Sequence, residues 1–149
     1  MPLGHINVTD WPRFDHAVRL WHAGRHREFR TVCEERVADE PYDPRALSLL
    51  TVACSLTGDL CRARELAGRV ISLTPNDPAA HGNLGNVLRA IGDLEGAIAS
   101  YRAALDLAPE QADAAYNLGV ALAASGAKTQ AEAYYRRAVA KNPAHRSAW

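Results

Sequence analysis

The first candidates for chemistry in this sequence are two histidines. His22 and His26 lie four residues apart, which is the spacing of metal ligands on one helix face. Gly24 lies between them and should end the helix, so the two imidazoles should belong to different helices. No third ligand accompanies them at a suitable spacing. We therefore expect neither a metal site nor a cofactor.

The three cysteines are spaced neither as metal ligands nor as a redox pair. Cys33 and Cys54 fall on positions that should face the core, whereas Cys61 falls on an outward position. An odd number of cysteines without such spacing favours a reduced, cytoplasmic setting. The sequence also lacks a glycine loop for phosphate and a nucleophile elbow. No catalytic residue is expected, and any enzymatic chemistry should lie beyond Trp149.

The charges argue against several classes of partner. The 17 basic and 17 acidic residues give a net charge of zero and form no long run of one sign. A nucleic-acid surface needs a clustered basic face, and a membrane protein needs a polybasic anchor or about 18 unbroken apolar residues. The first residues lack the cationic start and apolar core of a secretory signal. The excess of arginine over lysine and the abundant alanine suggest a GC-rich bacterial genome.

A period of 34 residues organises the elements that position these side chains. The stretch 78–111 contains two apolar-periodic runs, joined at a glycine and closed by a proline. A fixed period of this size is typical of a solenoid, in which helix pairs stack on their neighbours. The same two residue types recur in one register, as Gly24, Gly58, Gly92 and Gly126, and as Pro41, Pro75, Pro109 and Pro143.

Each period should form a helix-turn-helix repeat, with helix A before the glycine and helix B after it. In the first repeat, helix A should run from a start at Thr9-Asp10 to Ala23, and helix B from His26 to Asp39. The predicted helix caps are Asp43 and Asp77, each followed by proline, and Asp59 and Asp93 after the turn glycines. The expected boundaries are 1–9 for a lead-in, 10–43, 44–77, 78–111 and 112–145 for four repeats, and 146–149 for the start of a fifth.

The pattern within repeats three and four resembles the tetratricopeptide repeat (TPR) family. Repeat three has Leu84-Gly85, Ala97, Tyr101 and Pro109, and repeat four has Leu118-Gly119, Ala131, Tyr135 and Pro143. Gly85 and Gly119 are small where helices A and B must approach closely. Repeat one keeps mainly its glycine and proline, as a divergent terminal cap would. The resemblance implies an all-α fold, a right-handed superhelical solenoid of helix-turn-helix (TPR) repeats.

The resemblance also implies that helix A of each repeat lines a concave groove that holds an extended peptide. Asparagine suits this task because its amide both donates and accepts hydrogen bonds. Other inward-facing positions include Phe14 in repeat one and Leu49 in repeat two. The predicted peptide-binding residues are Asn83, Asn86, Asn117, Tyr116, Arg89, Val52 and Arg45.

Two precedents within the family compete for the asparagines. Asn83 and Asn117 lie one repeat apart at equivalent places, which resembles the asparagine ladder of O-GlcNAc transferase repeats, including those of bacterial proteins of that type. Asn86 and Asn117 also match two positions of the carboxylate clamp that binds heat-shock chaperones. The clamp needs a lysine where Gly82 stands, so we disfavour it. A third interpretation is that these asparagines merely cap or solvate helix A.

We therefore predict a protein-interaction module, a scaffold or adaptor, and no enzyme. The alternative is the substrate-presenting region of a larger transferase whose catalytic domain is absent from this sequence. Trp149 falls on the first aromatic position of a fifth repeat, so the chain is expected to be the N-terminal portion of a longer protein. The outer face of repeat four, with Leu122, Ala138 and Val139, should then be exposed, and this uncapped C-terminal end could self-associate.

Overall fold

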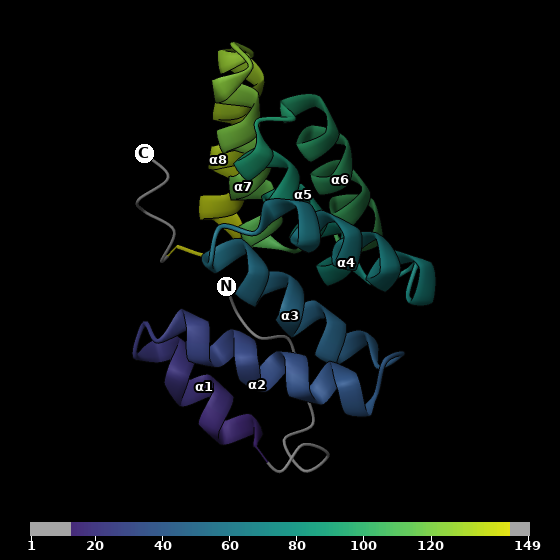
Figure 1. Cartoon of the computed structure of the whole chain (residues 1–149). Helices are drawn as coiled ribbons and strands as arrows, with labels where there is room; N and C mark the ends of the chain where they lie inside the picture. The colour runs from purple at the N-terminus through teal and green to yellow at the C-terminus, as the bar shows by residue number, and fades with distance from the viewer. Residues whose placement is uncertain (1–12, 144–149) are drawn as a thin grey trace. The chain divides into compact units, whose positions relative to one another are not determined.

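The computed structural model describes residues 13–143, and this range contains eight α-helices and no strand (Figure 1). The expected all-α repeat fold is confirmed. The lead-in, the Thr9-Asp10 start and the expected fifth repeat lie outside the described residues. The helices are α1 (Phe14–His22), α2 (His26–Asp39), α3 (Pro44–Leu56), α4 (Leu60–Leu73), α5 (Pro78–Ile91), α6 (Leu94–Leu107), α7 (Ala112–Ala124) and α8 (Lys128–Lys141).

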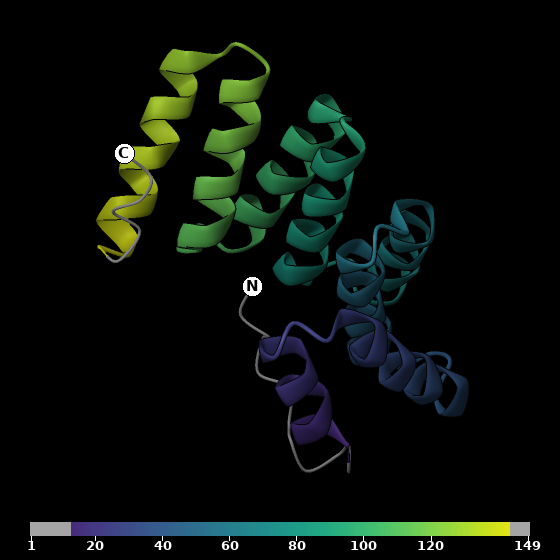
Figure 2. The ribbon, with the colours of Figure 1, turned by 60° about the vertical axis from the view of Figure 1, so that its left-hand side comes forward.

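The chain divides into two compact units, each of which contains two helical hairpins. The first unit (Met1–Thr74) holds α1 to α4, and the second unit (Pro75–Trp149) holds α5 to α8. In the first unit α2 packs against α3, and in the second unit α7 packs against both α6 and α5. Figure 2 shows α5 to α8 as consecutive antiparallel helices.

Glycine makes the turn inside every hairpin. Gly24, Gly58, Gly92 and Gly126 all have positive φ angles, between 71° and 96°, a region that other residues rarely adopt. Gly92 ends α5 in the left-handed conformation typical of a residue after a helix. The turn positions predicted from the 34-residue period are therefore confirmed.

Aspartates cap four of the helices, as the sequence predicted. Asp43 accepts a hydrogen bond from the Arg45 amide at 3.0 Å, and Asp77 accepts one from the Ala79 amide at 2.9 Å. Asp59 and Asp93 accept hydrogen bonds in the same way at the starts of α4 and α6. These carboxylates satisfy amides that have no partner within the helix. The capping therefore fixes where each helix begins.

The core of the second unit depends on a tyrosine ring lying against a glycine in each hairpin. A Cβ atom placed on Gly85 would lie 2.6 Å from Cε1 of Tyr101, and one on Gly119 would lie 2.7 Å from Cδ1 of Tyr135. No side chain larger than hydrogen fits at either place without a shift of the ring. The predicted close approach of helices A and B is thus confirmed.

The first unit has its own apolar core. Phe29 of α2, Leu47 and Leu50 of α3 and Leu66 of α4 are almost fully buried. The ring of Trp21 stacks on that of Phe29, with centroids 5.7 Å apart, which joins α1 to α2.

Four residues that we expected on outward-facing or groove-facing surfaces are buried instead. Phe14 and Leu49, predicted to line the groove, are 8% and 3% exposed. Leu49 lies on α3, which is apolar nearly all round. The positions of α3 that we expected to face the groove are therefore also packed against other residues. Leu122 and Ala138, predicted on the outer face of repeat four, belong to the core cluster formed by α5 to α8 and are 3% and 0% exposed. Val139 is half-buried.

Replacing Gly85 by alanine should destabilise the second unit. The added methyl group would collide with the buried Tyr101 ring, and such overpacking costs about 1–3 kcal/mol. Gly82 lies on the same helix but has no neighbouring atom within 4 Å of an added Cβ. Gly82→Ala should therefore stabilise the protein by about 0.5–1 kcal/mol. Urea unfolding of the two variants measures both effects, and equal shifts in the same direction would contradict the prediction.

Candidate functional site

The predicted site residues divide between the two units. Arg45 and Val52 lie on α3 of the first unit, whereas the other five predicted residues lie on α5 and α7 of the second. Arg45 is exposed, and its Nε atom lies 3.4 Å from the capping carboxylate of Asp43. Val52 is half-buried. The candidate site considered below is the surface that α5 and α7 form within the second unit.

Helix α5 presents three polar residues on one face. Asn83, Asn86 and Arg89 lie three residues apart, so their side chains are neighbours along the helix. All three are half-buried, while Val87, beside Asn83 on the helix, and Leu88, on the side away from all three, are buried in the core. The apolar residues of α5 therefore orient its polar face outward, toward a partner or solvent.

Tyr101 of α6 fixes the orientation of Asn86. Its ring lies over Gly85 and is fully buried, and its hydroxyl donates a hydrogen bond to Oδ1 of Asn86 at 2.6 Å. Because the carboxamide oxygen is used in this way, the two donor hydrogens of Asn86 remain for other contacts. Tyr101 thus makes Asn86 a donor toward any group that approaches the surface.

Arg89 lies close to the same hydroxyl. Burial raises the pKa of Tyr101 to about 12, and the neighbouring Arg89 guanidinium opposes part of this rise. The hydroxyl is therefore neutral at physiological pH and stays a donor to Asn86. Tyr101, Asn86 and Arg89 form one polar cluster between α6 and the outer face of α5.

Helix α7 contributes an aromatic residue and an amide. The ring of Tyr116 lies 5.7 Å from that of Tyr135, and both side chains are half-buried. Burial raises the pKa of Tyr135, and the nearby Tyr116 adds to the rise. Val120, one repeat after Asn86, puts an apolar side chain where α5 has the amide. Helices α5 and α7 occupy equivalent places in their repeats but present chemically different side chains.

Asn83 and Asn117 occupy equivalent places in α5 and α7. Both are half-buried, and neither amide hydrogen-bonds to another group in the described part of the chain. Asp77 caps α5, and Gln111 precedes α7 without a capping side-chain bond. The interpretation that these asparagines cap helix A is therefore wrong, and their amides can bind solvent or a partner.

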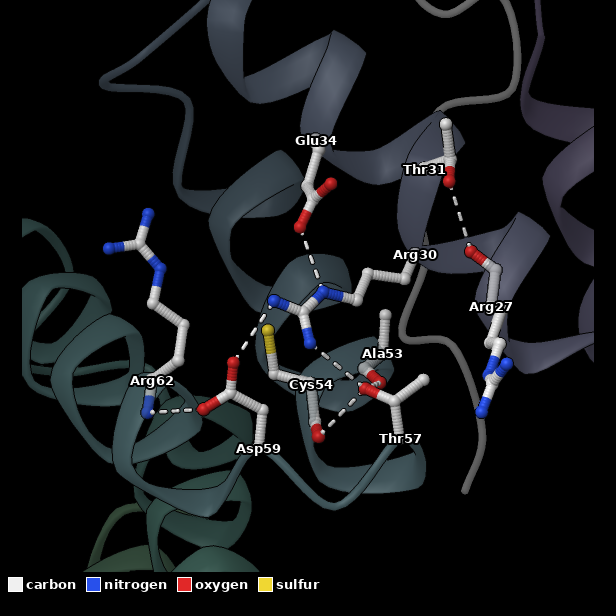
Figure 3. A network of polar contacts seen from close by, with 9 residues as sticks. All are labelled: Arg27, Arg30, Thr31, Glu34, Ala53, Cys54, Thr57, Asp59 and Arg62. Carbon is white, nitrogen blue, oxygen red and sulfur yellow. Dashed lines mark hydrogen bonds and ion pairs between the residues drawn. The ribbon is translucent and has the colours of Figure 1, made fainter.

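The structure also contains a polar cluster that the sequence analysis missed (Figure 3). Arg30 of α2 donates hydrogen bonds to Glu34 at 2.8 Å, to the Thr57 hydroxyl at 3.2 Å and to Asp59 at 3.0 Å. Thr57 and Asp59 flank the turn between α3 and α4. Arg30 thus pairs with two carboxylates, and its hydrogen bonds to Thr57 and Asp59 join α2 of the first hairpin to the turn of the second.

The histidines and cysteines considered for metal or thiol chemistry are spread over four helices, α1 to α4. His22 and His26 lie on different helices, as predicted. No group of three potential metal ligands occurs within residues 13–143. Burial raises the pKa of the Cys33 thiol to about 12 and also raises that of Cys54, which keeps both thiols protonated.

None of the described helices is long and apolar enough to span a membrane.

Comparisons with protein families identify the repeats of the second unit. A TPR repeat model matches residues 85–126, and a tetratricopeptide repeat model matches residues 112–145. No curated protein sequence matches the chain.

Solved structures extend the similarity to both units. A thermophilic TPR protein of Thermus thermophilus is 26% identical, with a TM-score of 0.84; the match covers 90% of this chain and 76% of that one. The MamA protein of Desulfovibrio magneticus is 27% identical, with a TM-score of 0.73 and coverage of 87% and 73%. An O-GlcNAc transferase of Thermobaculum terrenum is 33% identical with a TM-score of 0.68, but the match covers 72% of this chain and only 21% of the transferase.

The buried hydroxyl of Tyr101 should make the protein less stable in alkaline solution. Its pKa is about 12 in the folded state and about 10 in the unfolded chain. Between these values the unfolded state loses its proton first, so the free energy of unfolding falls as the pH rises. The loss should reach about 1 kcal/mol near pH 11.

Tyr101→Phe keeps the ring but cannot ionise, so its stability should decline less over the same range. Urea unfolding of both proteins between about pH 8 and about pH 11 measures the difference. If the two stabilities fall in parallel, the hydroxyl is not the group that titrates.

Proposed function

Because the chain belongs to the tetratricopeptide-repeat family, we propose that it is a non-catalytic interaction module that binds an extended peptide segment of a partner protein. The repeats support protein binding in general. The specific proposal is that the peptide lies along α5 and α7 of the second unit. We also propose the cytoplasm of a bacterium as the setting, and the 34-residue boundaries given above as the repeats.

The observation that carries this proposal is the pair of unpartnered amides on equivalent residues. Asn83 and Asn117 are half-buried, and neither amide bonds to another group in the described residues. Each amide can donate to a peptide carbonyl and accept from a peptide N–H without contacting the peptide's side chains. A partner bound in this way is recognised mainly through its backbone groups. These groups are accessible to both asparagines only if the peptide is extended.

The spacing of the two helices suits such a peptide. α5 and α7 contact each other, and packed helix axes lie about 8–10 Å apart. An extended chain advances about 3.3 Å per residue, so one repeat corresponds to about three peptide residues. Asn83 and Asn117 would then bind backbone groups three residues apart, while Tyr116 offers an apolar ring beside the second of them.

Replacing both asparagines should weaken peptide binding without changing the fold. We would select binders from a displayed library of linear peptides against the unchanged protein and then titrate one synthetic binder. At about 1 kcal/mol for each lost hydrogen bond, and with one to two bonds lost at each asparagine, Asn83→Ala combined with Asn117→Ala should raise the Kd by roughly 30-fold or more.

Asn76 provides the control, because it is exposed in the loop before α5. Asn76→Ala should leave the Kd unchanged, and circular dichroism should show equal helicity in all variants. An unchanged Kd in the double variant would refute the asparagine contacts, and a selection that yields no binder would refute peptide binding by this chain.

A second candidate function is the presentation of substrates to a transferase domain on the same polypeptide. The 33% identity to the Thermobaculum terrenum O-GlcNAc transferase supports it, although the chain spans only 21% of that protein. The sequence of the complete gene distinguishes the two candidates. A glycosyltransferase domain encoded after Trp149 would favour the second, and its absence would favour an independent adaptor.

Self-association through the C-terminal end stays a prediction. It is supported by fewer exposed apolar residues than we expected, because Leu122 and Ala138 are buried. The half-buried Tyr134, Tyr135 and Val139 also belong to the face that we predicted. Light scattering should show dimers at millimolar concentration, and appending a polar helix after Trp149 should abolish them. A monomer throughout the concentration range would contradict the prediction.

A further inference from the structure

We propose that Arg89 and Asn86 bind the carboxylate of an aspartate or glutamate side chain in the bound peptide. The inference rests on the proposed function and adds a selective contact to the backbone contacts of Asn83 and Asn117. The proposed contact requires the partner to have an acidic residue at one position of its sequence.

The cluster of Tyr101, Asn86 and Arg89 presents mainly donors to an approaching group. The Tyr101 hydroxyl donates to Oδ1 of Asn86, so one of the two lone pairs of this oxygen is already used. The two N–H hydrogens of the amide remain, and the adjacent guanidinium has donors and no acceptor. A group that binds here must supply acceptor oxygens, and negative charge strengthens the contact.

Arg89 differs from the other half-buried arginines in its partners. Arg30 and Arg36 are paired with carboxylates, and Arg69 and Arg137 donate to the backbone carbonyls of Pro41 and Pro109. Within residues 13–143, Arg89 pairs with no carboxylate, and its polar neighbour is the Tyr101 hydroxyl. A positive charge held half-buried beside a neutral group is complementary to an anion.

The position of Arg89 favours a side-chain carboxylate over a terminal one. Asn83 and Arg89 lie six residues apart on α5, which is about 9 Å along the helix axis. A backbone held by Asn83 and Asn117 therefore passes too far from Arg89 for direct contact. An acidic side chain extending from that backbone, met by the long arginine side chain, spans the gap.

The fourth repeat cannot make the same contact. Val120 and Ala123 stand one repeat after Asn86 and Arg89, and neither has a polar side-chain atom. The difference between the two repeats therefore determines the register of the bound peptide as well as the type of residue that it presents. One acidic residue faces α5, and the peptide residues that face α7 meet Tyr116 and Val120.

The test uses a double-mutant cycle on the full chain with a synthetic peptide selected from the linear library. The selected peptides should share an aspartate or glutamate at one position. Changing it to the matching amide should raise the Kd about tenfold or more, as expected for a lost charged hydrogen bond. With Arg89→Gln the same peptide change should have little further effect, because the two groups act on each other.

Three controls separate the sources of an effect. Arg102 on α6 is exposed, so Arg102→Gln removes the same charge elsewhere and should leave the Kd unchanged. Tyr101→Phe should weaken binding about threefold by releasing Asn86, whereas Tyr135→Phe in repeat four should not. A peptide with an amidated C-terminus should bind as tightly as the free acid, since the side chain carries the contact.

The outcomes distinguish this inference from the proposed function. If Asn83→Ala and Asn117→Ala weaken binding but the acidic residue and Arg89 show no coupling, the carboxylate contact is refuted and the peptide site stands. If amidation alone abolishes binding, a terminal carboxylate is bound and the inference is also wrong. If neither set of variants affects binding, or the library yields no binder, both proposals fail.

Discussion

A tyrosine ring lies directly on the backbone of the preceding helix at Gly85 and again at Gly119. The contact holds each hairpin of the second unit together, because any Cβ atom there would push the ring out of the core. It also determines where the tyrosine hydroxyl points. In repeat three the hydroxyl of Tyr101 reaches Asn86, the next residue of α5, whereas in repeat four the ring of Tyr135 meets Tyr116. One packing rule thus produces two different surfaces.

The candidate surface consists of residues that the fold itself does not require. The helix turns, caps and core account for the turn glycines, the capping aspartates and the buried apolar residues, and Asn83 and Asn117 have no part in them. Asn83 and Asn117 leave their amides available, and Tyr101 turns Asn86 into a donor. The buried hydroxyl therefore links the stability of repeat three to the chemistry of its outer face.

The 34-residue period was enough to predict the turns, the four aspartate caps and the close contacts of Gly85 and Gly119, because each depends on residues near in sequence. It failed for Leu49 and Leu122, whose burial depends on how apolar the whole helix is and on which neighbours pack against it. The partners of Arg30 also could not be predicted from the repeat period. A long charged side chain chooses its partners from tertiary neighbours, and Thr57 and Asp59 are distant in sequence. The candidate asparagines were chosen by their repeat positions, whereas the hydrogen bond from Tyr101 to Asn86 was not predicted.

The Arg30 cluster has a counterpart of opposite chemistry in the second unit. Two repeats after Arg30 and Asp59 stand Ile98 and Ala127, each of which packs against the apolar core of that unit. A hairpin joined to the wrong neighbour would set Ile98 against the carboxylate of Asp59, or bury the Arg30 guanidinium beside Ala127. Either mispairing would remove the ion pair between Arg30 and Asp59, and each group would keep only its local partner, Glu34 for Arg30 and the Arg62 amide for Asp59. Repeats of nearly the same shape are therefore not interchangeable, which favours the correct neighbours as the chain folds and limits how such a gene can gain, lose or reorder its repeats.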